Sequence, residues 1–381
     1  MQRHVALAVM ILAVAASGWA SPPQRETAAQ AQDVTGSADK KDEPKQGLHF
    51  SAWKVGGRLN YQLMYMRDAM SGMDLMSSTR GMLMAAELES TATLSTGSRD
   101  LLDLAVQYPY YTQMKGVDER GEDLHFFNAY GVFKLGLGKP SIRFGQFVIP
   151  FGNLPYYETH TLFLQSLYPQ SLGIRIQRGV SVDGFVRAYD YSVAAMGADG
   201  TREVLGRVAR RFDLPNAVFT VGLSALYGQH VQRFSTLLDP LMDDALPGAP
   251  LSQSIDFADK TRIALDAEYS MGRDLFRAEV VTGRDVQVST ANTDGLVNGQ
   301  FLQWNRALFS DKNELSFQLA RWEQPDGTRL RLGASYGRKL HQYLTARVSV
   351  ERSLGRAPDG RRNETDLALQ LVCDVPKLLG R

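Results

Sequence analysis

From about residue 50 onward, hydrophobic and polar residues alternate with a period of two. In 328–336, Leu330, Leu332 and Ala334 fall on one side of the chain, whereas Arg329 and Arg331 fall on the other. The ranges 262–269 and 343–351 show the same pattern. Because successive side chains of a β-strand point to opposite faces, this alternation predicts strands that have one apolar face and one polar face.

The alternating segments run to about nine to twelve residues, the length that a tilted strand needs to cross a bilayer. Strands of soluble proteins average about five or six residues. Tyr and Phe recur at the segment ends, as in the aromatic girdles of membrane barrels. The pattern predicts about sixteen strands, at 51–66, 80–96, 99–111, 124–136, 140–148, 174–188, 189–197, 202–212, 217–228, 260–270, 274–283, 297–308, 312–323, 328–338, 342–352 and 364–373.

The connections between these segments alternate between long and short. The ranges 68–79, 112–123, 229–259, 283–295 and 354–363 are long, whereas 97–98, 138–140, 270–273 and 310–312 are short. Outer-membrane barrels have short periplasmic turns and long extracellular loops, because consecutive strands end on opposite sides of the membrane. We therefore predict an all-β fold, a transmembrane antiparallel β-barrel of about 16 strands that occupies residues 49–381.

The N-terminal residues have a different character. Arg3 precedes an apolar run at 5–16 that is too short to span a membrane, and Gly18 and Ala20 suit a cleavage site after Ala20. Ser, Pro, Gln, Ala, Asp and Lys dominate 21–48, which cannot bury a core. We expect a signal peptide at 1–20 and a disordered periplasmic linker at 21–48.

The third long connection, roughly 148–173, is apolar and aromatic where the others are polar. Its apolar side chains are Phe151, Tyr156, Tyr157, Leu162, Phe163, Leu164, Leu167 and Tyr168. An apolar loop exposed to water is unusual, so we predict that this loop folds into the barrel and narrows it. Covering the barrel mouth and forming a contact in a trimer are the alternatives. The candidate constriction residues are Arg143, Glu158, His160, Arg175 and Arg178.

Placing the polar faces inward gives a set of arginines along the lumen. These candidate pore-lining residues are Arg58, Arg207, Arg211, Arg262, Arg329, Arg331 and Arg347. Acids expected on the same faces are Asp103, Glu87, Glu89, Asp266, Glu268 and Glu351. Facing rows of opposite charge set an ion preference, and guanidinium groups bind anions. A weak preference for anions is one prediction, and ordinary charge pairing across strands is the other.

Several segments resemble a known family. The run from Arg143 to Gly152, RFGQFVIPFG, is similar to the "GQF…PFG" segment of the phosphate-selective porin O and P family. The run from Arg178 to Phe185, RGVSVDGF, resembles the strand that follows, and residues 55–59 resemble the opening strand. The resemblance implies a 16-stranded trimeric outer-membrane channel with an inward third loop. The third connection of this chain has no lysine, so phosphate specificity is not implied, and the chain ends at Arg381 without an aromatic residue.

The remaining features exclude other classes of protein. The formal net charge of +1 shows no basic excess for nucleic acid, and the single cysteine, Cys373, permits no internal disulfide. None of the six histidines has metal-ligand spacing, and nucleophile-elbow and phosphate-loop motifs are absent. We therefore expect neither an enzyme, a metal site nor a cofactor.

We expect a porin in the outer-membrane lipids of a bacterium, with the chain as a homotrimer that lets small hydrophilic or anionic solutes diffuse passively. The alternative is a barrel that sheathes a partner protein such as a multihaem cytochrome.

Overall fold

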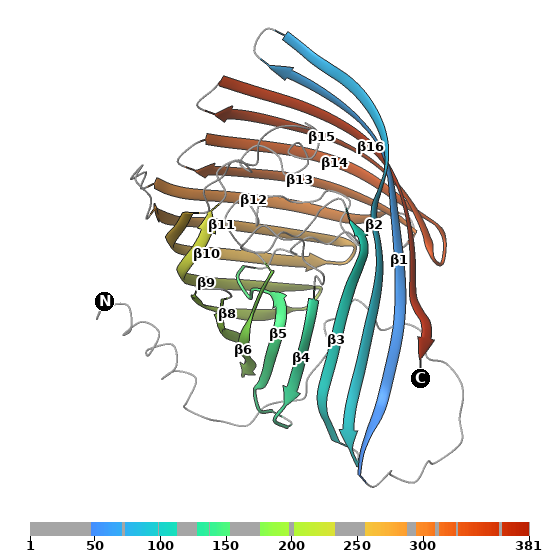
Figure 1. The fold of residues 1–381 in the computed structure, drawn as a ribbon, viewed down its shortest axis with the longest axis vertical. Helices are drawn as coiled ribbons and strands as arrows, with labels where there is room; N and C mark the ends of the chain where they lie inside the picture. Colours follow the sequence, from blue (N-terminus) through green and yellow to red (C-terminus); the bar gives the residue numbers. More distant parts are fainter. Residues whose placement is uncertain are drawn as a thin grey trace.

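The computed structural model describes residues 47–70, 73–97, 99–112, 128–136, 138–152, 176–197, 202–232, 256–287, 295–308, 312–324, 327–357 and 360–380. These residues form one closed antiparallel barrel of sixteen strands (Figure 1). The strands are β1 (Leu48–Met70), β2 (Met73–Thr96), β3 (Arg99–Thr112), β4 (Asn128–Lys134), β5 (Ser141–Val148), β6 (Ile176–Val186), β7 (Tyr189–Met196), β8 (Glu203–Leu214), β9 (Ala217–Gln232), β10 (Asp256–Met271), β11 (Asp274–Gln287), β12 (Gly295–Leu308), β13 (Asn313–Gln324), β14 (Gly327–His341), β15 (Leu344–Ala357) and β16 (Gly360–Gly380).

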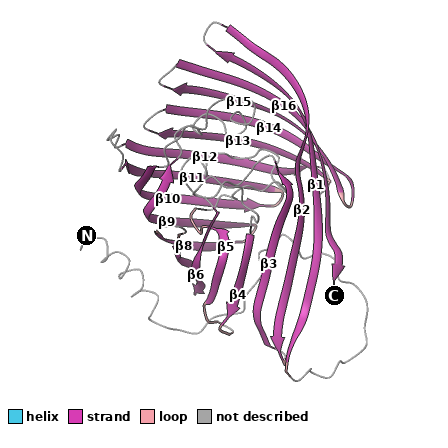
Figure 2. Cartoon of the chain, in the orientation of Figure 1, coloured by secondary structure: helices cyan, strands magenta, loops and turns pink. Residues whose placement is uncertain are grey.

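Regular structure among the described residues consists of strands (Figure 2). No helix in the described ranges is long and apolar enough to cross a membrane. Each strand predicted from the alternation coincides with an observed strand, so the predicted fold class is confirmed.

Two predicted long connections are wrong. β1 and β2 stay paired up to Met70 opposite Met73, and β15 and β16 up to Ala357 opposite Gly360. The predicted loops at 68–79 and 354–363 are therefore largely strand. The backbone hydrogen bonds of a ladder do not need an apolar side-chain face, so a hairpin can extend beyond the alternating pattern.

β16 closes the barrel against β1, with Cys373 opposite Leu59. The last strand continues to Gly380, so its predicted end near Cys373 is also wrong. Pro376 has no N–H, so it cannot donate a hydrogen bond to the ladder. The register shifts between Val55 and Gly57, and this irregularity accommodates Pro376 on the partner strand.

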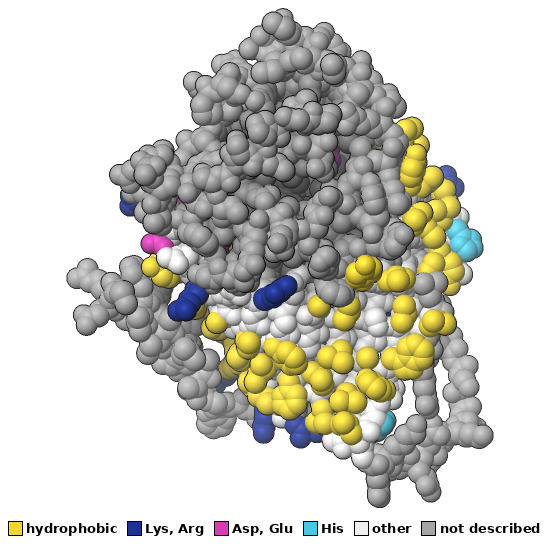
Figure 3. All heavy atoms as spheres, in the orientation of Figure 1, with side chains coloured by type: hydrophobic (Ala, Val, Ile, Leu, Met, Phe, Trp, Pro, Cys, Tyr) yellow, Lys and Arg dark blue, Asp and Glu magenta, His cyan; other side chains and the backbone are white. Residues whose placement is uncertain are grey.

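The barrel wall has an apolar outer face and a polar inner face. Large hydrophobic side chains such as Leu223, Leu265, Val280 and Leu302 are exposed on the outside. On the face of the barrel shown in Figure 3, hydrophobic side chains gather in a broad band. Residues one position away, such as Asp266, are buried on the inside. An apolar exterior on a barrel without sheet edges is suited to a lipid bilayer. The molecule is therefore built as a bacterial outer-membrane protein.

The two ends of the barrel differ in the length of their connections. At one end, two-residue connections join the strands at 187–188, 215–216, 272–273 and 342–343. At the other end, three connections are long, at 113–127, 149–175 and 233–255, whereas 71–72, 325–326 and 358–359 have two residues each. Short turns face the periplasm in barrels of this kind. The periplasmic end therefore holds the start of β1 and the end of β16 (Figure 1).

Candidate pore and its lining

The third connection leaves β5 and enters the lumen with its first four residues, 149–152. Ile149 and Phe151 are buried in an apolar cluster with Leu226 of β9 and Val281 of β11. The backbone N–H of Gly152 donates a hydrogen bond to Ser224 Oγ of β9 at 3.0 Å. β9 is the fourth strand on from β5 in the barrel order. These residues therefore extend inward from the wall at β5 to the inner face of a separate stretch of wall.

Gly152 makes this close approach because it has no side chain. Its φ is +68°, a region that side chains rarely adopt, and a Cβ would overlap the Glu279 carboxylate of β11. Glu158, His160 and Arg175, three of the predicted constriction residues, lie at 153–175, outside the described residues.

Arg143 lies at the base of this connection, on the inner face of β5. Its guanidinium group forms an ion pair with Asp183 of β6 at 3.3 Å. It also lies 5.4 Å from the ring centroids of both Tyr130 and Phe147. Ion pairing and the two rings fix its orientation. About a third of the side chain (33%) stays exposed, so Arg143 is accessible on the inner side of the wall.

Arg178 is not brought together with Arg143. On β6, Gln177 and Ser181 are buried on the inner face, and Arg178 has the opposite parity, which it shares with the exposed Val180. Its Nε donates to Gln146 Oε1 at 3.4 Å on the outer face. Nearness to the loop in sequence suggested the constriction, but strand alternation directs Arg178 away from the lumen.

The seven predicted pore-lining arginines all lie on inner faces, and most of them have carboxylate partners. Arg58 contacts Glu89 at 3.0 Å and Asp374 at 2.8 Å. The other recorded pairs are Arg207 with Asp266, Arg211 with Asp213, Arg262 with Asp285, and Arg331 with Glu351 and Asp366. Arg329 and Arg347 are buried, at 6% and 9% exposed.

The densest group of pairs lies on β8–β11. Nε and Nη2 of Arg207 donate to Asp266 at 3.1 and 2.6 Å. The Arg207 guanidinium group and the Asp266 carboxylate meet over Gly222 of β9, where a side chain would collide with both of them. Lys260 and Glu203 form a further pair at 2.7 Å and are almost fully buried.

Sequence reasoning did not find the pair of Lys260 and Glu203. The signal for it is the glycine at position 228, which lies between these two residues in the ladder.

At Arg58 the two carboxylates face the lumen more openly than the arginine that they bind. The Arg58 side chain is 7% exposed, whereas those of Glu89 and Asp374 are 40% and 46% exposed. The guanidinium group therefore lies against the wall behind its acidic partners.

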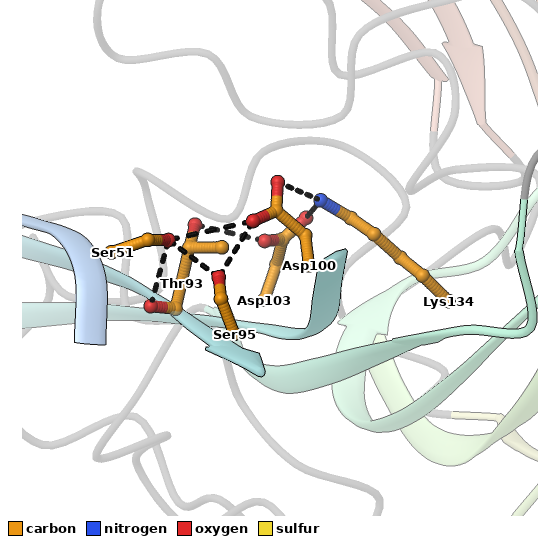
Figure 4. A network of polar contacts seen from close by, with 6 residues as sticks. All are labelled: Ser51, Thr93, Ser95, Asp100, Asp103 and Lys134. Carbon is orange, nitrogen blue, oxygen red and sulfur yellow. Dashed lines mark hydrogen bonds and ion pairs between the residues drawn. The ribbon is translucent and has the colours of Figure 1, made fainter. Parts of the chain in front are cut away.

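A polar network lines the periplasmic mouth (Figure 4). Lys134 of β4 forms ion pairs with Asp103 at 2.7 Å and with Asp100 at 3.7 Å. Ser95 donates to Asp100 at 2.6 Å, and Thr93 donates to Asp103 at 2.9 Å. The two carboxylates are 50% and 37% exposed, so the mouth presents two acids for one lysine.

Within the described ranges, no group of His, Cys, Asp or Glu side chains is arranged to hold a metal ion. Charged side chains on the inner wall bind one another instead.

No protein-family model matches the sequence, and no curated protein matches it. Solved structures do match. OprB of Pseudomonas putida is 14% identical with a TM-score of 0.59, over 84% of this chain and 94% of that one. An anion-selective porin from Comamonas acidovorans is 12% identical with a TM-score of 0.54, over 86% and 100%. The trimer form of OmpT, an outer membrane protein of Vibrio cholerae, is 10% identical with a TM-score of 0.55, over 84% and 99%.

At these identities the likeness is one of fold. This chain has the fold of outer-membrane porins.

Proposed function

We propose that this chain is a porin that lets small hydrophilic solutes diffuse passively across a bacterial outer membrane. The observation that carries the proposal is the first part of the third connection, which meets the inner wall at Ser224. A closed barrel with a polar inner face provides an aqueous path, and a segment across it limits the size of solutes. The proposal assigns the chain no catalytic role.

An inward third connection is part of this proposal. The remaining residues of 153–175, with Glu158, His160 and Arg175, would narrow the lumen beside Arg143. A sheath around another protein needs an unobstructed lumen, and residues 149–152 occupy part of it. Diffusion of small solutes is therefore the better supported of the two functions.

We propose only a weak charge preference. The arginines that favoured anions in the sequence have carboxylate partners, as Arg58, Arg207 and Arg262 show. A paired guanidinium group contributes little net potential to the lumen. The phosphate-selective O and P family remains a resemblance carried by motifs such as 143–152. A homotrimer is the proposed assembly, since one porin-like fold relative is described in a trimer form.

The test is single-channel recording in planar bilayers, with Arg143→Gln and Arg178→Gln as a matched pair. Both variants lose one positive charge on neighbouring strands, but Arg143 faces the lumen and Arg178 faces outward. Folded wild-type protein should give stepwise conductance. Arg143→Gln should move the reversal potential in a salt gradient toward cations, and Arg178→Gln should leave it unchanged.

The channel would be ruled out if protein that is shown to be folded, by a gel mobility that changes on heating, gave no conductance steps. Equal shifts in the two variants would remove Arg143 from the proposed constriction.

A further inference from the structure

A row of aromatic rings on the outer face stops abruptly between β13 and β14. The row takes one residue from each of six neighbouring strands, with successive ring centroids 5.5–6.3 Å apart: Phe212, Phe219, Tyr269, Phe276, Trp304 and Phe317. The next residues in the same register are Ala334 of β14 and Val350 of β15. A small side chain thus follows six rings, and the wall is hollowed there.

The hollow is a groove of about 470 Å³ on the outer wall. Trp304 and Phe317 form one side, Ala334 lies at the floor, and Val350 and Arg352 form the other side. The volume lies in the range of small-molecule sites. Apart from Arg352, the outward side chains that line it are apolar.

Arg352 is an unusual residue for this position. It lies on the outer face beside Leu332 and is exposed. Among the described residues it has no recorded ion pair or hydrogen bond. A charged side chain on the lipid-facing wall is unfavourable unless it reaches an interface or finds a partner there.

The position of Arg352 along the strand indicates which leaflet supplies that partner. Arg352 lies eight residues after β15 begins at Leu344, at the periplasmic end. With tilted strands this is about 20 Å along the barrel axis, near the outer edge of an apolar band about 25 Å tall. Trp304 and Phe317 lie closer to the periplasmic ends of their strands. The groove therefore runs from the middle of the membrane toward an arginine in the outer leaflet.

We infer that this groove binds a phosphate-bearing lipid of the outer leaflet. An acyl chain lies between Trp304, Phe317 and Val350, and Arg352 binds the phosphate, which guanidinium groups recognise well. Glu323, an acidic residue on the same face, already lies 3.8 Å from Arg321. A lipid phosphate supplies a counter-charge for Arg352 more directly than a second copy of this wall would. The inference is independent of conduction through the lumen.

The experiment is native mass spectrometry of the folded full chain in mild detergent. The probes are diphosphoryl lipid A and lipid A from which both phosphates have been removed. Ala334→Phe continues the ring row and fills the groove, whereas Arg352→Gln removes only the charge. Arg210→Gln is the control, because Arg210 also lies on the outer face, 4.7 Å from the Phe212 ring near the periplasmic end.

Wild-type protein should bind the phosphorylated form about fivefold more tightly than the dephosphorylated form. Arg352→Gln should abolish that ratio, Ala334→Phe should weaken binding of both forms, and Arg210→Gln should change neither. The inference would be overturned if the wild type showed no preference for the phosphorylated form. It would also be overturned if folded Arg352→Gln protein bound both forms as tightly as the wild type does. A third contrary result would be an Ala334→Phe variant that no longer forms an oligomer but still binds lipid as the wild type does. The groove would then be a contact between two copies of this chain.

Discussion

At Gly152 the backbone comes within hydrogen-bond distance of the inner wall at β9, four strands away from β5. The N–H donates to Ser224 Oγ, and the Glu279 carboxylate occupies the space where a Cβ would be. A residue with no side chain and a positive φ thus holds the start of the third connection in the lumen. We therefore expect the width of the proposed pore to depend on this contact.

Replacing Gly152 with Ala should therefore change conduction. The new Cβ would collide with Glu279 and displace residues 149–152. Single-channel conductance in planar bilayers should change in size or become heterogeneous. Gly272→Ala is the control, because Gly272 has a similar φ of +58° with nothing within 4 Å. Each variant loses about 1 kcal/mol of stability because alanine disfavours a positive φ. Only Gly152→Ala also introduces the collision, so an equal effect of both variants on conductance would contradict the role given to Gly152.

Single residues show where sequence reasoning succeeds and where it fails. Period-two alternation placed Arg262 and Arg331 on the inner face, because parity along a strand is a local property. Arg178 was assigned by its nearness to the loop, and the strand directs it outward. The pairing of Lys260 with Glu203 spans two strands that are distant in sequence, so it depends on register, which one sequence does not reveal.

At the scale of elements, strand identity could be predicted and strand length could not. The alternation in β14 and β15 is strong, because one face of each strand is apolar. Near Met70 and Met73 the pattern fades, but the backbone ladder continues. β16 likewise continues past Pro376 because a register shift on β1 accommodates it. Hydrophobic patterns report burial, whereas strand ends are set by backbone pairing.

Closure between β1 and β16 can be tested with the single cysteine of the chain. Cys373 lies opposite Leu59, and directly opposed residues have Cα atoms about 4.5–5.5 Å apart, within the range of a disulfide. Leu59→Cys should therefore form a disulfide with Cys373 under a mild oxidant, seen as a reduction-sensitive change in gel mobility of the unfolded chain. Tyr61→Cys is the control, because Tyr61 lies opposite Leu371. More efficient cross-linking in Tyr61→Cys would show that the register is shifted.

For the whole molecule, the charges of the lumen divide into two groups. On β8–β11, away from the periplasmic end, the pairs are buried, and the side chains of Asp266 and Glu203 are 0% exposed. Toward the periplasmic end the charges face open space, as Asp100, Asp103 and Asp374 show. A buried pair acts on a passing ion mainly as a weak dipole. We therefore expect the exposed and incompletely balanced groups to set the charge preference of the proposed pore.

The periplasmic mouth gives the decisive test of this view. Asp100 and Asp103 share one lysine, Lys134, so removing both carboxylates leaves a net positive charge at the mouth. A unit charge acts on an ion about 8 Å away through water with about 0.5 kcal/mol, which corresponds to about a twofold change in relative permeability. Asp100→Asn combined with Asp103→Asn should therefore shift the reversal potential in a potassium chloride gradient toward anions.

The matched control is Glu323→Gln, which removes a carboxylate from the outer face of β13. It should leave the reversal potential unchanged, because the barrel wall separates Glu323 from the lumen. The shift at the mouth should shrink as salt rises, since exposed charges are screened within about 10 Å at 0.1 M. The opposite result would be a reversal potential that stays at the wild-type value in the Asp100→Asn, Asp103→Asn double variant but shifts in Arg262→Gln. It would mean that the buried wall of β8–β11, and not the exposed mouth, governs which ions pass.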